Sequence, residues 1–422
     1  MKRIRINNFK EYLYHETLEN GLNIYILPLT NKNNYSCMYV TKYGGKDIKF
    51  KKGNKEYKVP TGIAHFLEHK VFERKEDPFD FYGKSGTDVN AFTSNDHTCY
   101  YFLGNKNFNR GLKYLLNWLK DLNITEEQVQ KEQGIILEES SMYKDNPDRV
   151  LYNKIRENIF INEPSKYKVI GTDEDIVKIT KQDLDLCFNT FYKPNNMYLL
   201  ISGNVNPQKA LKTIKEELKQ VTPDNSIVEK LYDEEPDEVA KEYEEIKMNV
   251  EIPKVAIGYK IPKSLFKDLD IKQIELDIYL HGLLNISLGP TSEIREKWLK
   301  ENLFTTSYYR ITEIKSHYII ELYATSNREQ ELIKSLERYV KDLKIDEESF
   351  KREKKLWIAH EIKALDSPLS ALYSVLDDLL DYGEYINNKI EIINNLNYKT
   401  LKKVKEKINF KNKTIVRIIP NR

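Results

Sequence analysis

The chain has 422 residues, which suggests two or three domains that each bury a hydrophobic core. Its 67 basic and 65 acidic residues give a formal net charge of +2, and its lysines are spread along the chain, so we expect no nucleic-acid partner. Three widely separated cysteines, an N-terminus without an apolar signal segment and the lack of any run near the ~20 apolar residues of a membrane span favour a cytoplasmic protein that does not enter a membrane.

The first part of the chain is predicted to open with a hairpin. Two alternating runs, 12–16 and 22–28, flank Asn20-Gly21, which is a strong hairpin signal. Thr125 and Gln128 have the spacing of a capping box at the start of a long helix. Further strands are expected at 35–43, 87–103 and 196–202, and helices at about 107–121, 125–144, 148–160, 181–191 and 207–220.

A change of composition near the middle divides the chain. Residues 222–245 are rich in Pro, Asp, Asn and Glu, which is typical of a linker. We expect an α+β protein of two similar halves, each a mostly antiparallel sheet packed with helices, at 1–222 and 247–422, joined by an acidic linker at 223–246. The second half has strand patterns at 255–261, 317–324 and 414–419, and helix patterns at about 268–286, 290–301, 327–342 and 346–364.

A candidate metal motif lies in the first half, where residues 65–69 read His65-Phe66-Leu67-Glu68-His69. Residues three and four apart share one face of a helix, so His65, Glu68 and His69 project in one direction. Two imidazoles can hold zinc, and a nearby carboxylate can take a proton from a water that the metal polarises. The order H-x-x-E-H is the inversion of the commoner zinc motif H-E-x-x-H. We expect Thr61 to cap this helix.

A third metal ligand is expected on the helix at 125–144. Glu132 and Glu139 are seven residues apart, almost two turns, so they share a stripe with Ile135 and Ile136 between them. Carboxylates on such a stripe are expected to point inward, where a metal ion or a paired group offsets the cost of burial. We choose Glu139 as the ligand and Glu132 as the group that orients a ligand histidine, and expect Glu138 to face solvent. A glutamate-rich surface helix is the alternative that the pattern leaves open.

Several motifs together resemble a known family. The H-x-x-E-H motif at 65–69 is followed some seventy residues on by E-x-G-I-I-x-E-E at 132–139. This arrangement resembles the inverted-motif zinc metallopeptidases pitrilysin, insulysin and the mitochondrial processing peptidase. Residues 85–93, SGTDVNAFT, look like the family's G-x-x-x-N-A-x-T segment, and 191–197, FYKPNNM, like its F-Y-x-P-x-N-M segment. Residues 142–147, MYKDNP, are similar to the short bacterial insulinase-like branch.

The resemblance implies roles for individual residues in a catalytic half at 1–222. It implies that Glu68 is the general base that polarises the attacking water. One Zn²⁺ per chain would be held by His65, His69 and Glu139. The strand near residue 90 would be a sheet edge that receives the substrate as an added strand. The residues expected to contact the substrate are Asn90, Ala91 and Phe92.

The second half departs from the family pattern. Active members carry an Arg and, seven residues later, a Tyr in a segment like R-E-K-x-G-L-x-Y. If Arg295 takes the Arg position, Asn302 stands at the Tyr position; in the other register Trp298 and Thr305 take these places. Neither register restores the pair. Three nearby residues could substitute for it: Tyr308, Tyr309 and Arg310.

The resulting hypothesis is a zinc metalloendopeptidase that hydrolyses peptides in an enclosed chamber, by Glu-assisted attack of water at the metal. The family closes this chamber with four α+β units, and the chain supplies two, so a homodimer or a heterodimer with a paralogous chain is implied. The first alternative is a noncatalytic or weakly active partner subunit of a heterodimeric peptidase. The second is a protease that matures leader-bearing peptides.

Overall fold

The computed structural model describes residues 1–7, 9–222, 224 and 226–421. Its α+β class, with sheets packed against helices, agrees with the sequence prediction. The chain forms two compact units, and each is assembled from three segments. Unit 1 contains Met1–Ser140, Tyr167–Tyr232 and His360–Lys389. Unit 2 contains Ser141–Lys166, Asp233–Ala359 and everything from Ile390 onward.

These units differ from the boundaries expected at 222 and 247 in two segments. Residues 141–166 belong to unit 2 and residues 360–389 to unit 1. The cause is the same in both cases, because each segment contributes a helix whose apolar face covers a sheet formed by a distant part of the chain. Composition along the chain marks a change of polarity, but it carries no information about which sheet a helix covers.

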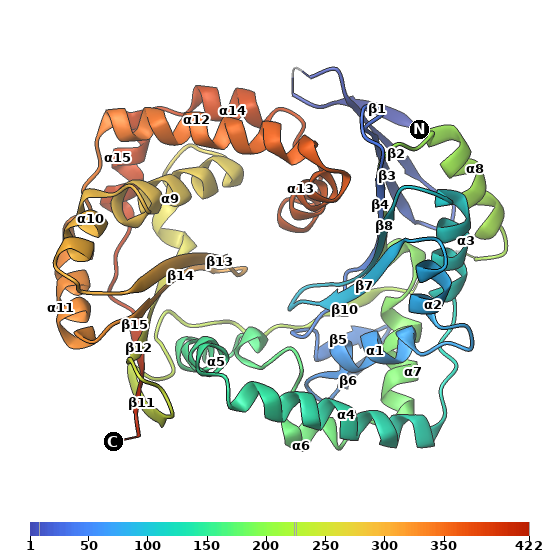
Figure 1. Cartoon of the computed structure of the whole chain (residues 1–422), viewed down its shortest axis with the longest axis horizontal. Coiled ribbons are helices and arrows are strands. Elements are labelled where there is room, and N and C mark those ends of the chain that lie inside the picture. Colours follow the sequence, from blue (N-terminus) through green and yellow to red (C-terminus); the bar gives the residue numbers. More distant parts are fainter. Residues whose placement is uncertain (8, 223, 225, 422) are drawn as a thin grey trace. The chain divides into compact units, whose positions relative to one another are not determined.

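The main sheet of unit 1 has seven strands in the order β1-β2-β3-β9-β4-β8-β7 (Figure 1). All neighbours are antiparallel except β3 and β9. Gly21 has φ of 87°, and the turn at Asn20-Gly21 joins β2 to β3 as predicted. The strands are β1 (Lys2–Arg5), β2 (Tyr12–Thr17), β3 (Asn23–Pro28), β9 (Met197–Gly203), β4 (Tyr35–Thr41), β8 (Thr98–Gly104) and β7 (Asp88–Thr93).

Helices cover both faces of this sheet. α13 lies against β4 and β9, and its Leu372, Val375 and Leu376 pack on Met38 and Leu200. This helix was not predicted from the sequence. The helices of unit 1 are α1 (Ile63–Phe72), α2 (Pro78–Gly83), α3 (Phe108–Trp118), α4 (Glu126–Lys144, whose last turn passes into unit 2), α6 (Asp173–Ile176), α7 (Lys181–Phe191), α8 (Pro207–Glu217) and α13 (Pro368–Asp381).

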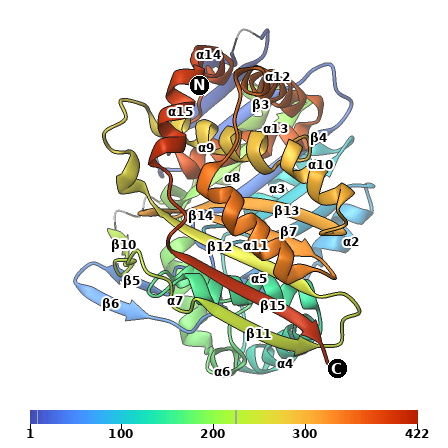
Figure 2. The ribbon, with the colours of Figure 1, turned by 90° about the vertical axis from the view of Figure 1, so that its left-hand side faces the viewer.

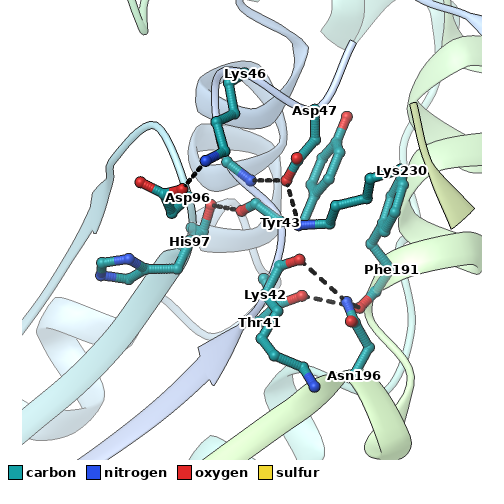
Figure 3. A network of polar contacts seen from close by, with 12 residues as sticks. Thr41, Lys42, Tyr43, Lys46, Asp47, Asp96, His97, Phe191, Asn196 and Lys230 are labelled. Carbon is teal, nitrogen blue, oxygen red and sulfur yellow. Dashed lines mark hydrogen bonds and ion pairs between the residues drawn. The ribbon is translucent and has the colours of Figure 1, made fainter. Parts of the chain in front are cut away.

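A second, small sheet of unit 1 is attached by a buried polar network (Figure 3). The Asp47 carboxylate is fully buried and accepts hydrogen bonds from the Gly44 N–H at 2.9 Å and from Lys230 Nζ at 2.7 Å. Burial raises the pKa of Asp47, and the Lys230 ammonium opposes that rise. The network connects the loop after β4 to β10, so we assign it a structural role. The small sheet consists of β10 (Val228–Lys230), β5 (Lys49–Lys52) and β6 (Lys55–Lys58).

Unit 2 is built on a five-stranded sheet in the order β11-β15-β12-β14-β13, antiparallel except for β11 and β15 (Figure 2). Helix α5 covers one face, and α9, α10, α11 and α15 cover the other. The strands are β11 (Tyr243–Met248), β12 (Lys254–Pro262), β13 (Thr306–Glu313), β14 (His317–Thr325) and β15 (Lys413–Pro420). The helices are α5 (Pro147–Ile159), α9 (Gln273–Leu288), α10 (Glu293–Lys300), α11 (Glu329–Tyr339), α12 (Glu347–Lys363, whose last turn belongs to unit 1), α14 (Lys389–Asn395, whose first residue belongs to unit 1) and α15 (Tyr398–Lys407).

Much of the expected acidic linker at 223–246 is anchored rather than free, although its residues 223 and 225 lie outside the described part of the chain. Glu235 is 7% exposed and forms an ion pair with Lys260. The same carboxylate accepts three consecutive backbone N–H groups, those of Ile161, Asn162 and Glu163. A carboxylate in such a nest contributes to the fold, so an acidic run is not by itself evidence of a solvated linker. Within the described residues, no helix is both long and apolar enough to cross a membrane.

Candidate metal centre

The start of α1, the motif helix, is held by a close approach of two loops. Gly62 has φ of 87°, and a Cβ there would lie 2.3 Å from the carbonyl oxygen of Ile170. Gly171, with φ of 93°, faces it from the other loop. Thr61 was expected to cap the helix, but its hydroxyl instead donates to Asp175 at 2.7 Å, and the N-cap residue is Gly62. The Thr61 hydroxyl bonds Asp175 of α6 instead of a backbone N–H of α1, because the carboxylate is a charged acceptor.

The three predicted metal ligands converge in unit 1. The Nε2 atoms of His65 and His69 each lie 3.8 Å from Glu139 Oε2, and the imidazole centroids are 4.6 Å apart. Two ligands about 2.0–2.2 Å from one zinc ion can be separated by up to roughly 4.2 Å, so the spacing fits one ion. Nε2 is the atom of His65 that faces Glu139, and its buried Nδ1 has no hydrogen-bond partner among the described residues. Two imidazoles and one carboxylate are a ligand set that zinc accepts.

Helix α4 presents Glu139 as the sequence pattern predicted. Its capping box is present: the Gln128 N–H donates to Thr125 Oγ1 at 3.2 Å, and the Thr125 N–H donates to Gln128 Oε1 at 2.8 Å. Glu138 is exposed, as predicted. Ile136 is buried, but Ile135 is 44% exposed. The inward stripe is therefore narrower than expected, because the helix contacts its unit along a single row of side chains.

Glu132 connects His69 to a buried lysine. Its Oε1 lies 2.9 Å from His69 Nδ1, and its Oε2 lies 3.1 Å from Nζ of Lys70. Burial tends to raise the pKa of Glu132, but the hydrogen bonds from His69 and Lys70 lower it below its ordinary value. Lys70 was not among the site residues predicted from the sequence. The available signal was a lysine at helical spacing from Phe66 and Leu67, on the apolar stripe of the motif helix.

Glu68 lies beside the ligands on the same face of α1. Thr93 at the end of β7 donates its hydroxyl to Glu68 Oε2 at 2.6 Å. Burial raises the pKa of Glu68, and the hydrogen bond from Thr93 lowers it in part. Thr93 was quoted only within the family-like segment, because nothing in a linear pattern shows which strand residue contacts a helix.

The two ligand histidines differ in their electrostatics. Burial and the neighbouring His69 lower the pKa of His65 to about 4, so its ring is neutral at physiological pH. Burial also opposes charge on His69, but its hydrogen bond to Glu132 raises the pKa of His69 above the ordinary value. A metal ion binds the neutral form of imidazole, and the Nδ1 hydrogen bond to Glu132 leaves Nε2 of His69 free to bind.

The predicted substrate strand is a sheet edge. Among the described strands β7 pairs only with β8, so its other side has no partner strand. The Ala91 N–H donates to the Asn90 side chain at 2.8 Å. Asn90 has an exposed side chain and Ala91 is half-buried. Phe92 packs in an aromatic cluster with Tyr101 and Tyr373, on the face opposite Thr93. The backbone of all three predicted residues thus lies at the edge, while the ring of Phe92 is turned into unit 1.

The possible substitutes for the Arg–Tyr pair lie on β13 of unit 2. The Tyr309 hydroxyl donates to Asn285 within this unit. Tyr308 is 54% exposed and its ring stacks on Tyr323. Arg310 is exposed and lies over the Tyr152 ring at 5.0 Å. Tyr308 and Arg310 therefore share one face of β13, and Tyr309 is on the other.

A mixed sheet of this kind, with H-x-x-E-H on one helix and a glutamate from a second helix at the same point, defines the class of inverted-motif metallopeptidase folds. The comparisons agree. The family model "Insulinase (Peptidase family M16)" matches residues 54–173, and the model "Peptidase M16 inactive domain" matches residues 178–356. The chain belongs to the insulinase family, peptidase family M16.

Similar proteins are named proteases. The uncharacterized zinc protease YmfH of Bacillus subtilis is 37% identical over 73% of this chain and 73% of its own length. The zinc protease PqqE of Helicobacter pylori is 30% identical over 68% of this chain and 62% of its own length. The crystal structure of an M16-like peptidase from Alicyclobacillus acidocaldarius has a TM-score of 0.90 at 27% identity, covering 98% of this chain and 99% of that one.

Proposed function

We propose that the chain is a zinc metalloendopeptidase with one Zn²⁺ held by His65, His69 and Glu139. The observation that carries the proposal is the convergence of these three ligand atoms beside the carboxylate of Glu68. The names of the similar proteins support zinc as the metal. Zinc, when bound, would polarise a water molecule and a peptide carbonyl and lower the pKa of the water from 15.7 to about 7.

The residues of the chain have separate roles in the hydrolysis of a peptide bond. Glu68 accepts the proton of the attacking water and returns it to the leaving amine. Thr93 holds one oxygen of Glu68, so the other oxygen is directed to the water. Glu132 accepts the Nδ1 hydrogen of His69 and fixes the orientation of that ring.

The substrate is proposed to bind as an added strand on the open edge of β7. The open strand edge near Asn90, Ala91 and Phe92 can bond the backbone of any extended peptide, whatever its side chains. The Asn90 carboxamide, which accepts the Ala91 N–H at 2.8 Å, would have to release it if that N–H is to bond the peptide. The register would bring a peptide bond past Thr93, whose hydroxyl touches the base. Peptides, rather than folded proteins, fit this mode because every residue at the edge must be extended.

We further propose that the working form is a homodimer, or a heterodimer with a paralogous chain, that encloses the site in a chamber in the cytoplasm. Unit 2 lacks the Arg–Tyr pair in either register, so the groups that would stabilise the developing oxyanion are not supplied at the expected positions. Activity of the chain alone is therefore expected to be low. A weakly active partner subunit is the second candidate, and the same missing pair favours it.

The proposal is tested with purified protein and internally quenched extended peptides. We expect cleavage that a zinc chelator abolishes and added zinc restores. Glu68→Gln is expected to lose cleavage, while Lys131→Met, an exposed position on α4, retains it. Cleavage that persists in the chelator, or that is equal in Glu68→Gln, would contradict the proposal.

A further inference from the structure

Helix α1 buries a lysine directly behind the metal ligands. Lys70 is 1% exposed, although its neighbours Phe66, Leu67 and Val71 form the apolar face of the helix. A buried ammonium is costly unless it is paired and hydrogen-bonded, so a lysine at such a position needs a specific partner. Any aliphatic side chain would fill the same space without that cost.

The partners of Lys70 identify what it does. Its Nζ lies 3.1 Å from Glu132 Oε2 and 3.5 Å from the Gln128 carbonyl oxygen, and it forms an ion pair with Glu73. Glu73 is exposed and Gln128 contributes only its backbone, so Glu132 is the buried group whose charge Lys70 compensates. The pairing divides the Glu132 carboxylate between two donors: Oε2 is held by Lys70 and Oε1 by His69 Nδ1.

We propose that Lys70 is a positioning residue of the metal centre, which acts through Glu132 to hold His69 with Nε2 directed at the ion. This inference rests on the proposed function, because it concerns the ring that would bind zinc. Lys70 prevents the Glu132 carboxylate from rotating away from His69. It also supplies the positive charge that lets two glutamates, Glu132 and Glu139, lie at the two nitrogens of one imidazole. The ammonium does not touch a reacting atom, so its effect is on metal affinity and ring orientation.

The test is a double-mutant cycle on zinc affinity. The variants are Lys70→Met, which keeps an unbranched side chain one atom shorter and removes its charge, Glu132→Gln, and the double variant. Zinc dissociation constants are measured by competition with a chelator, and the melting temperature of each metal-free protein is recorded separately. Loss of an outer partner of a metal ligand typically weakens binding about 10–100-fold, and we expect Lys70→Met to fall in this range.

The cycle separates positioning from simple packing. If Lys70 acts through Glu132, Lys70→Met should weaken zinc binding less than about twofold in the Glu132→Gln background. If Lys70 only joins two helices, the metal-free melting temperature falls while the zinc affinity of Lys70→Met stays that of the wild type, and the inference is overturned. Equal, additive losses in both backgrounds would also overturn it, since they exclude action through Glu132.

Two controls complete the design. Lys131→Met removes an exposed lysine of α4 beside Glu132 and should leave zinc affinity unchanged. Lys70→Gln, whose amide can still donate to Glu132, should show an intermediate loss, and it replaces Lys70→Met if the latter does not fold. If the wild type itself binds no zinc, the proposed function fails. If the wild type binds zinc and neither Lys70 variant weakens binding, only the inference about Lys70 fails.

Discussion

His69 uses both of its ring nitrogens, and this double use explains most of the polar chemistry around the metal centre. Nδ1 is bonded to Glu132, and Nε2 faces Glu139 together with Nε2 of His65. A similar division applies to Glu68, where one oxygen is held by Thr93. His69 and Glu68 are therefore each held from behind by a second polar side chain, whereas the buried Nδ1 of His65 has no hydrogen-bond partner among the described residues. Such support keeps reactive groups in place before a substrate binds.

Glu68→Gln is expected to keep zinc and to lose most hydrolysis. The amide has nearly the same shape but cannot accept the proton of the attacking water, and general-base assistance is typically worth about 10²–10⁴-fold in kcat. Zinc content and peptide cleavage are measured on the same preparation. Near wild-type cleavage by the variant would point to another base.

The site residues that share one face of a single helix were predictable from their spacing. The site residues that join the centre through packing between elements were not. His65, Glu68 and His69 are placed by the spacing of one helix, and Glu139 by the face that it shares with Glu132. Lys70 lies on the buried face of α1 and contacts Glu132, and Thr93 lies at the end of β7 and contacts Glu68. Their roles follow from which elements pack together, and this information is not local in the sequence.

At the scale of elements, the entry into α1 is a tightly constrained turn of unit 1. Gly62 and Gly171 both have φ near 90°, and the backbones of their loops are in contact. Only glycine allows both the left-handed conformation and the close approach. The first ligand, His65, lies three residues after Gly62, so this contact sets the position of the whole motif helix.

Gly62→Ala is expected to lower the free energy of unfolding by at least about 2 kcal/mol, because a left-handed alanine costs roughly 1–2 kcal/mol and its Cβ would lie 2.3 Å from a carbonyl oxygen. Gly134→Ala is the matched control. A Cβ at Gly134 in α4 would meet nothing within 4 Å, so this change should stabilise the protein by about 0.5–1 kcal/mol. Thermal melts of the two variants should thus shift in opposite directions, and a shared direction would contradict this description of the turn.

Asp378 on helix α13 is expected to make the free energy of unfolding depend on pH. Asp378 accepts the Ile386 N–H at 3.1 Å and pairs with Lys389 at 2.6 Å. Burial nevertheless raises the pKa of Asp378 to about 6, from an ordinary value of 3.8. A raised pKa means that the folded state holds the proton more tightly. The stabilisation is therefore complete below pH 3.8 and is lost as the pH rises through about 6.

Asp378→Asn should remove this dependence. As the pH falls from 6.5 to 4, the free energy of unfolding of the wild type should gain on that of Asp378→Asn by on the order of 1–3 kcal/mol, at about 1.4 kcal/mol per pKa unit. Asp366→Asn, at an exposed position just before α13, is the control and should follow the wild type. A constant difference between wild type and Asp378→Asn across this pH range would exclude the raised pKa.

The strongly periodic elements of the fold were predicted, including β2, β3, β12, α3 and α7. α13 was missed, although its apolar residues are well spaced, because its place in unit 1 depends on β4 and β9, more than 150 residues away. The acidic run before β11 was interpreted as a linker because its local composition is polar. The contact that holds it is not local, since the N–H nest that binds Glu235 is formed by residues 161–163. In both cases the deciding contact is long-range.

At the scale of the whole molecule, the chain has a complete candidate ligand set but not the family's Arg–Tyr pair. Trp298, which takes the Arg position in one register, is buried and donates its indole N–H to Ser335 at 2.8 Å. Asn302, at the Tyr position of the other register, forms a left-handed turn with φ of 54°. The indole N–H of Trp298 is therefore already used within unit 2, and Asn302 has no phenol hydroxyl to take the place of the Tyr.

We therefore expect weak peptidase activity from the isolated chain and a dimer as the working form. A paralogous partner should raise kcat more than it lowers KM, because the missing contacts act on the transition state. Sedimentation combined with cleavage assays over a range of protein concentrations checks both points. A strict monomer with full activity that does not depend on concentration would contradict this expectation.

The central claim is the zinc centre, and the most direct measurement is the zinc content of purified protein by elemental analysis. Three proteins are compared: the wild type, Glu139→Ala, and Glu138→Ala, whose side chain is the exposed neighbour on α4. We predict one zinc per chain in the wild type and in Glu138→Ala, and a large loss in Glu139→Ala. Zinc retained at the wild-type level by Glu139→Ala, or lost in Glu138→Ala instead, would contradict the assignment of His65, His69 and Glu139 as the metal site.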